Sequence, residues 1–269
     1  MGSITAIITV YKRNYLDEQL ASLLNQSVLP EAIWIVQNEN NVNFREVIDK
    51  YSSLFTRISV FNSQINLKYF GRFSMVMFAE TEYVLVIDDD VIPGPQWLAT
   101  CLATCNRYNA IVSCTGRIIM PGTFRPEAID EDKFKQYFIG DNYTTDEYNY
   151  CREDTLVDYG CNSYFFRKEW IKHFWHIWPC TFLSGEDIHL SGSLKTLGSI
   201  PTVVPRQTSV GESGNTKKLY SQDMLSSWRN DDFIDIREEV FTYLIKTKRW
   251  KPVLWKNAEQ LSDYAVSLV

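Results

Sequence analysis

Three consecutive aspartates, Asp88 to Asp90, directly follow the apolar stretch YVLVI at residues 83–87. Carboxylates this close repel one another and resist burial, so a compensating positive charge is expected beside them. A hard divalent cation such as Mn²⁺ or Mg²⁺ takes oxygen ligands and commonly completes its shell with water and substrate phosphates. Asp88 and Asp90 alternate with Asp89 in an extended segment and can face one site, which makes both candidate metal ligands. The simpler alternative is that the aspartates are solvated at the end of a strand or cap the helix expected near Pro95.

A second acidic pair, Glu186-Asp187, lies in the stretch SGEDIHL. Acidic residues stabilise the start of a helix through the dipole and by capping, and this accounts for the pair by itself. Two separate acidic motifs also suit metal-assisted group transfer. One would hold the cation that neutralises a departing diphosphate, and the other would take a proton from the incoming hydroxyl.

Apolar strands and amphipathic helices alternate through the first part of the chain. This alternation predicts an α/β fold, with a parallel sheet and helices on both of its faces. Ligands of such sheets bind beyond the carboxyl ends of the strands, where residues 11–13, 37–41 and 88–90 fall. Strands are expected within residues 4–13, 32–41, 57–63, 83–90 and 110–120, and helices within 15–28, 44–55, 71–81 and 94–108.

The second half of the chain is less regular. Residues 121–155 are polar and rich in tyrosine, which indicates a long loop. A strand or hairpin that enters a helix is expected over 155–174, a helix over 185–198 and a short strand over 200–207. The segment 208–219 is rich in Gly, Ser and Lys, which predicts a mobile loop. No repeat or clean linker divides the chain, so residues 1–269 are expected to form a single domain.

Composition narrows the function classes. The chain of 269 residues is 45% hydrophobic and 22% charged, which is typical of a globular protein, and its net charge of -6 disfavours a nucleic-acid-binding surface. No apolar run approaches the roughly 20 residues of a membrane span, and no secretory signal begins the sequence, so a cytoplasmic protein with free thiols is expected. The first strand lacks the G-x-G-x-x-G motif of dehydrogenases.

Five motifs, in this order and spacing, resemble the nucleotide-sugar glycosyltransferases of the GT-A fold, and among them the exostosin-like catalytic domains. The resemblance implies a Rossmann-like, mixed but mostly parallel central sheet flanked by helices. Residues 1–120 would bind the nucleotide sugar, and residues 121–269 would bind the acceptor and supply a lid loop and a C-terminal tail. The motifs are Tyr11 with Arg13, Asn38, Arg72, Asp88 to Asp90, and Glu186-Asp187 followed by isoleucine.

The same resemblance implies a metal-dependent enzyme that moves a sugar from a UDP-sugar donor to a hydroxyl of a glycan acceptor. Asp90 would bind Mn²⁺ (or Mg²⁺) directly, and Asp88 would reach the metal through water. Asp187 would be the general base, and Glu186 would hold the acceptor or its loop in place. A lone base slightly favours an inverting mechanism, and a retaining mechanism, known among the nearest relatives, stays open. The implied donor-binding residues are Val10, Tyr11, Arg13, Asn38, Arg72, Asp88, Asp89, Asn162 and Arg229.

The sequence departs from that pattern in two respects. The late histidine that serves many GT-A enzymes as a metal ligand is absent, since the last histidine, His189, falls inside a predicted helix. The membrane anchor of secretory-pathway relatives is also absent, so a soluble enzyme is expected. One such enzyme would be a chlorovirus-type xylosyltransferase, with xylose as the donor sugar. The loop with Lys217 and Lys218 is expected to act as a lid and to help define the acceptor.

Two other functions stay open at this stage. A sugar nucleotidyltransferase could share the fold, although it would need a glycine-rich loop after the first strand, and VYKRNYLDEQ contains no glycine. A non-catalytic glycan-binding module, or a degenerate transferase, could keep the fold without the reaction, although the intact Asp90 and Asp187 disfavour it.

Overall fold

The computed structural model describes residues 2–53, 55, 57–121, 137–140, 151–217 and 223–255. Its strands form an eight-stranded sheet and a three-stranded sheet. The large sheet contains β1 (Ile4–Val10), β2 (Ala32–Gln37), β3 (Ile58–Asn62), β4 (Tyr83–Ile87), β5 (Ile111–Val112), β8 (Thr155–Val157), β10 (Ser163–Arg167) and β11 (Thr202–Val204). The small sheet contains β6 (Thr115–Arg117), β7 (Phe138–Ile139) and β9 (Tyr159–Cys161).

The large sheet is mixed and mostly parallel, as expected from the sequence. Its strand order is β3-β2-β1-β4-β10-β5-β11-β8. The strands β3, β2, β1 and β4 run parallel, β10 is antiparallel to both β4 and β5, β11 is parallel to β5, and β8 is antiparallel to β11. The carboxyl ends of β1, β2 and β4 therefore meet at one edge.

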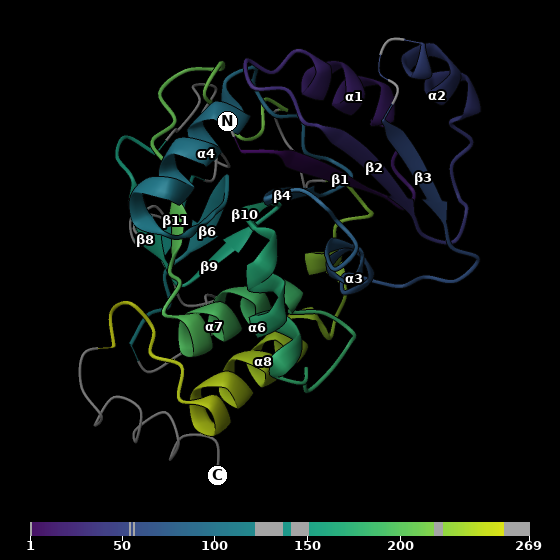
Figure 1. The fold of residues 1–269 in the computed structure, drawn as a ribbon. Coiled ribbons are helices and arrows are strands. Elements are labelled where there is room, and N and C mark those ends of the chain that lie inside the picture. Colours follow the sequence, from purple (N-terminus) through teal and green to yellow (C-terminus); the bar gives the residue numbers. More distant parts are fainter. Residues whose placement is uncertain are drawn as a thin grey trace.

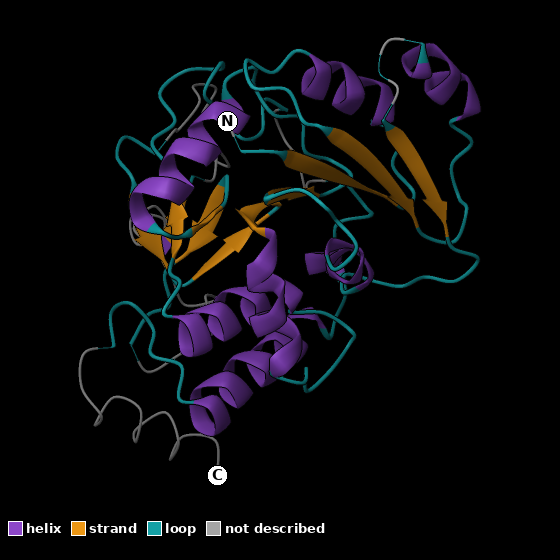
Figure 2. Cartoon of the chain, in the orientation of Figure 1, coloured by secondary structure: helices purple, strands orange, loops and turns teal. Residues whose placement is uncertain are grey.

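Helices cover both faces of this sheet (Figures 1 and 2). Figure 1 shows α1, α2 and α4 on one side, and α3, α6, α7 and α8 on the other. Since β1, β2 and β4 are covered on both faces, their residues are almost all buried and their sequences are mainly apolar, without the regular alternation of a half-exposed strand; the edge strand β3 is less buried. The helices are α1 (Leu16–Leu24), α2 (Arg45–Ser52), α3 (Gly71–Val76), α4 (Trp97–Tyr108), α6 (Ile171–His176), α7 (Glu186–Gly198) and α8 (Phe233–Lys248), with short 3-10 turns at Lys168–Trp170 and Ser227–Arg229.

The central strand β4 explains where the aspartates fall. All five of its residues are buried, and Phe165 of the neighbouring strand β10 stacks on Tyr83 with ring centroids 5.3 Å apart. Leu16, Leu20 and Leu23 of α1 supply part of the same core at helical spacing. A strand so firmly buried holds the residues that follow it at the carboxyl edge of the sheet.

The stretch 110–120, expected as one strand, is divided between the two sheets. It contains β5 of the large sheet and β6 of the small one, with the change at Ser113 and Cys114. The Ser113 hydroxyl hydrogen-bonds the carbonyl oxygens of Cys161 and Ser163, at 2.8 and 2.5 Å. Because this partner segment comes later in the chain, the local apolar pattern gives no sign of the division.

The segment 208–217, expected as a mobile lid, is hydrogen-bonded to the turn that follows the aspartates. Gly94 N–H donates to the Ser213 carbonyl at 2.7 Å, and Ile92 N–H donates to Asn215 Oδ1 at 3.0 Å. The Lys217 ammonium lies over the Tyr15 ring, 3.1 Å from its centroid. These contacts make the segment a support for the aspartate turn.

Two further expectations concern parts of the chain beyond this description. Lys218 and most of the tyrosine-rich loop 121–155 lie outside the described residues. All six cysteines are free thiols, as expected; four are buried, Cys151 is half-buried and Cys180 is exposed. Within the described ranges, the helices are too short or too polar to cross a membrane.

Candidate active site

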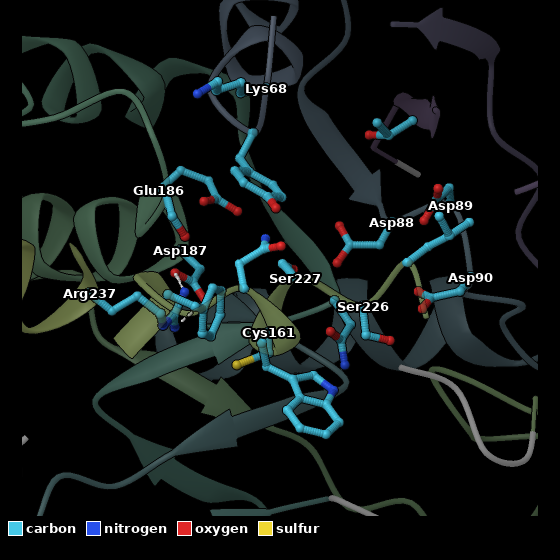
Figure 3. Close-up of a pocket in the computed structure, with 18 of the residues that line it drawn as sticks. Lys68, Asp88, Asp89, Asp90, Cys161, Glu186, Asp187, Ser226, Ser227 and Arg237 are labelled. Carbon is cyan, nitrogen blue, oxygen red and sulfur yellow. Dashed lines mark hydrogen bonds and ion pairs between the residues drawn. The ribbon is translucent and has the colours of Figure 1, made fainter. Parts of the chain in front are cut away.

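A cavity of about 1030 Å³ opens at the carboxyl ends of β1, β2 and β4. Figure 3 shows Asp88, Asp89 and Asp90 along one side of it, with Glu186 and Asp187 on the opposite side. The two acidic motifs, far apart in the sequence, therefore face one another across a single pocket.

Uncharged groups hold the aspartate turn in place. Asp88 N–H donates to the carbonyl oxygen of Asn162 at 3.0 Å. The buried Gln19 of α1 donates its amide to the carbonyls of Asp88 and Val91, at 2.8 and 2.9 Å. Since these bonds use only main-chain groups of the turn, they leave the aspartate side chains to other partners.

Two arginines balance part of the charge of the aspartates. Arg72 is ion-paired with Asp88, and Arg13 Nη1 lies 2.6 Å from Asp89 Oδ1 and 3.7 Å from Asp90 Oδ2. Burial nevertheless raises the pKa of Asp88 to about 7 and that of Asp89 to about 6, against the opposing effect of the arginines. The charges of the neighbouring aspartates contribute to both of these rises, because three carboxylates lie beside only two arginines.

The cluster fits a hard divalent cation that is shared with a ligand. Among the described residues, no group of three His, Cys, Asp or Glu side chains forms a complete metal site. Asp88 and Asp90 can offer carboxylate oxygens beside an open cavity, which suits a cation that takes its other ligands from water and phosphates. The residues present would thus hold such a cation only together with a phosphate-bearing molecule.

The second acidic pair lies at the start of α7, and each of its carboxylates has an arginine partner. Gly185 precedes it at φ 80°, a left-handed conformation that glycine tolerates. Glu186 Oε1 accepts from Arg72 Nη2 at 2.8 Å, and Arg237 of α8 forks onto Asp187 at 2.9 and 2.8 Å. Burial, and next the charge of Asp187, raise the pKa of Glu186 to about 7. Arg72 therefore joins the two acidic motifs, and Arg237 orients Asp187.

The structure brings most of the predicted donor-binding residues to this cavity and leaves out two. Val10 is a core residue whose carbonyl accepts from Asn38 N–H at 2.8 Å. Arg229 donates from Nε to the carbonyl of Asp223 at 2.9 Å and is not among the residues that line the cavity. The predicted donor-binding residues that do line it are Tyr11, Arg13, Asn38, Arg72, Asp88, Asp89 and Asn162.

Arg237 is a residue of the site that the sequence reasoning missed. It lies on the buried face of α8 with Val240, Phe241 and Leu244. An arginine at a position of the apolar stripe of an amphipathic helix requires a buried acidic partner, and this pattern could have identified it. Gln19 and Asp223 carried no such signal.

Comparison with known proteins agrees with this fold. Residues 5–174 match the family described as glycosyl transferase family 2. No curated protein matches the chain significantly. Among solved structures, TarS from S. aureus is similar at 15% sequence identity and a TM-score of 0.51, over 97% of this chain and 47% of the TarS chain. The chain thus spans about half the length of TarS, and the likeness concerns the fold. Because residues 5–174 match the model of this family, the chain belongs to glycosyl transferase family 2.

Proposed function

We propose that this chain transfers a sugar from a nucleoside-diphosphate donor, with UDP as the expected nucleotide, to a hydroxyl of a glycan acceptor. The observation that carries the proposal is the pair of acidic motifs facing one another across one cavity, as Figure 3 shows. Residues 1–120 supply the donor side of that cavity and residues 121–269 supply the acceptor side. Xylose and an exostosin-like specificity rest on the sequence resemblance.

On the donor side, Asp90 and Asp88 would hold Mn²⁺ or Mg²⁺ against the diphosphate. The cation supplies charge neutralisation for the leaving group. Arg13, fixed beside Asp89, adds a permanent positive charge at the same edge. Asn38 lines the cavity, where its Oδ1 accepts Leu67 N–H at 3.2 Å, and its amide would meet the nucleotide.

On the acceptor side, Asp187 is the proposed general base. The two hydrogen bonds from Arg237 orient its carboxylate and leave lone pairs to accept a proton. A single base that removes the proton from an attacking hydroxyl favours inversion at the anomeric carbon. Glu186 shares Arg72 with Asp88 and so connects the acceptor side to the aspartate cluster.

The test begins with donor binding. Thermal unfolding is measured with UDP-xylose, UDP-glucose, UDP-N-acetylglucosamine and GDP-mannose, each with Mn²⁺ or with EDTA. We expect one donor to raise Tm only with Mn²⁺, and Asp90→Asn to abolish the rise while Asp49→Asn, at the exposed end of a surface ion pair, retains it. Equal shifts in EDTA, or an unchanged shift in Asp90→Asn, would contradict the proposed metal site.

Turnover then separates an enzyme from a binding module. Wild type is expected to release UDP from its donor, and Asp187→Asn should lose about 10²–10⁴-fold in transfer rate while keeping the Mn²⁺-dependent donor shift. Glu186→Gln is the matched comparison, because it neutralises the adjacent carboxylate. A larger loss in Glu186→Gln than in Asp187→Asn would reassign the base, and donor binding without any turnover would identify a non-catalytic module.

A further inference from the structure

One wall of the cavity is built by residues 223–230, here called the strap. The strap leads into α8 and contains the 3-10 turn Ser227–Arg229. It lines the cavity while presenting three large apolar side chains to solvent, at 46–84% exposure. Those three residues are Met224, Leu225 and Trp228. An apolar rim on an otherwise strongly charged cavity suggests a surface for a substrate.

Arg13 ties the strap to the donor side. Asp223 accepts a forked pair of hydrogen bonds from Arg13, with Nε to Oδ2 at 2.6 Å and Nη2 to Oδ1 at 2.7 Å. The remaining Nη1 of Arg13 binds Asp89 at 2.6 Å. A guanidinium suits this task because its planar fork fits one carboxylate and leaves a further donor for another.

Asp223 also organises the strap internally. Its Oδ1 accepts the N–H of Leu225 at 3.0 Å and the hydroxyl of Ser226 at 3.1 Å. Its carbonyl accepts Nε of Arg229, whose guanidinium lies 4.5 Å from the centre of the Trp228 ring. The orientation of the Trp228 indole is thereby linked to Asp223, and through Asp223 to Arg13.

We propose that Asp223 is a positioning residue that fixes the strap as the acceptor wall, and that Trp228 stacks on a sugar ring of the acceptor. This inference rests on the proposed function. The half-exposed indole at the rim offers an apolar surface for the C–H face of a sugar, while the charged residues deeper in the cavity bind the reacting hydroxyl. Because Arg13 contacts both Asp89 and Asp223, the donor side and the acceptor wall are held by one side chain.

The first experiment identifies an acceptor. A glycan array is probed with the wild-type chain in Mn²⁺ and UDP, and the glycan bound most strongly serves as acceptor in kinetic assays. We expect Trp228→Ala to raise KM for that glycan about five- to tenfold, and Trp228→Phe to restore most of the loss. The rate of donor hydrolysis should change less than twofold. Absence of binding to every glycan on the array would overturn the proposal.

The second experiment isolates the charge pair. Asp223→Asn keeps the shape of the side chain, and Asp231→Asn is the matched control on the adjacent exposed turn. We expect Asp223→Asn to raise the acceptor KM up to about fivefold, the upper range for a partly exposed pair, with the donor KM unchanged. Added NaCl should raise the acceptor KM of wild type toward that of Asp223→Asn and leave the variant almost unaffected, since the salt screens only an intact pair.

The outcomes separate this inference from the proposed function. If Asp223→Asn lowers the donor KM or speeds donor hydrolysis, Asp223 competes with the donor for Arg13, and the positioning role is wrong. If donor hydrolysis is normal while neither Asp223→Asn nor Trp228→Ala changes the acceptor KM, the strap is not the acceptor wall. If no donor is bound or hydrolysed at all, the proposed function itself fails.

Discussion

Replacing Arg72 with methionine tests the charge balance that holds the site together. Arg72 is 4% exposed and pairs with two carboxylates, Asp88 at 25% exposure and Glu186 at 6%. Methionine fills a similar apolar volume but leaves both carboxylates without this cation. Removing one partner of a buried ion pair costs about 3–5 kcal/mol. Because Asp88 can partly rehydrate, we expect the lower end, about 3 kcal/mol, at pH 8.

The loss should depend on pH with a definite sign. Without Arg72 the pKa values of Asp88 and Glu186 rise above their wild-type values of about 7, because the stabilising charge is gone. The folded variant then binds more protons than folded wild type between pH 5 and pH 8. Its stability relative to wild type therefore improves as pH falls, and the loss should be clearly smaller at pH 5.5 than at pH 8.

The assay is urea unfolding followed by tryptophan fluorescence, in EDTA, at both pH values. Arg45→Met is the control, since Arg45 pairs with Asp49 at 3.9 Å between side chains that are 88% and 73% exposed. That exposed pair should contribute little. A loss in Arg72→Met below about 1 kcal/mol at pH 8, or an equal loss at both pH values, would refute the reasoning.

Three further predictions concern the scaffold. His189 is buried, and burial lowers its pKa to about 4, so as pH falls below 6.5 the unfolded chain binds a proton at this position before the folded chain does. By pH 4 this difference should lower the free energy of unfolding by about 3 kcal/mol. Urea titrations should find this pH dependence in wild type and not in His189→Gln. Gly94→Ala would place a Cβ 2.1 Å from the carbonyl oxygen of Val210, so thermal unfolding should show a loss of about 1–3 kcal/mol, and a normal Tm would contradict the packing. Asp223, whose pKa the Arg13 hydrogen bond lowers to about 2, keeps its charge down to about that pH. The salt effect on acceptor KM should therefore be equal at pH 8 and pH 9, where Asp89, with a pKa of about 6, is also ionised.

Much of the fold could be predicted because its signals are local. The alternation of apolar strands with helices gave correct positions for β1 to β4 and for α1, α2 and α4, each within a few residues. The boundary that failed, between β5 and β6, depends on which later strand pairs with each piece, and no local pattern records that choice. Family membership also follows from the sequence, through the match over residues 5–174.

The partners within the site were decided by tertiary structure. The sequence by itself determined that Asp88 to Asp90 end a buried strand and that Glu186 and Asp187 begin a helix, because burial pattern and helix capping depend on near neighbours. Only the folded chain decided that Arg237 holds Asp187 and that Asp223 holds Arg13. An ion pair between residues far apart in sequence depends on how whole helices and turns pack. The place of Arg237 on the apolar stripe of α8 indicates only that it needs an acidic partner, and the strap carries no local sign of Arg13.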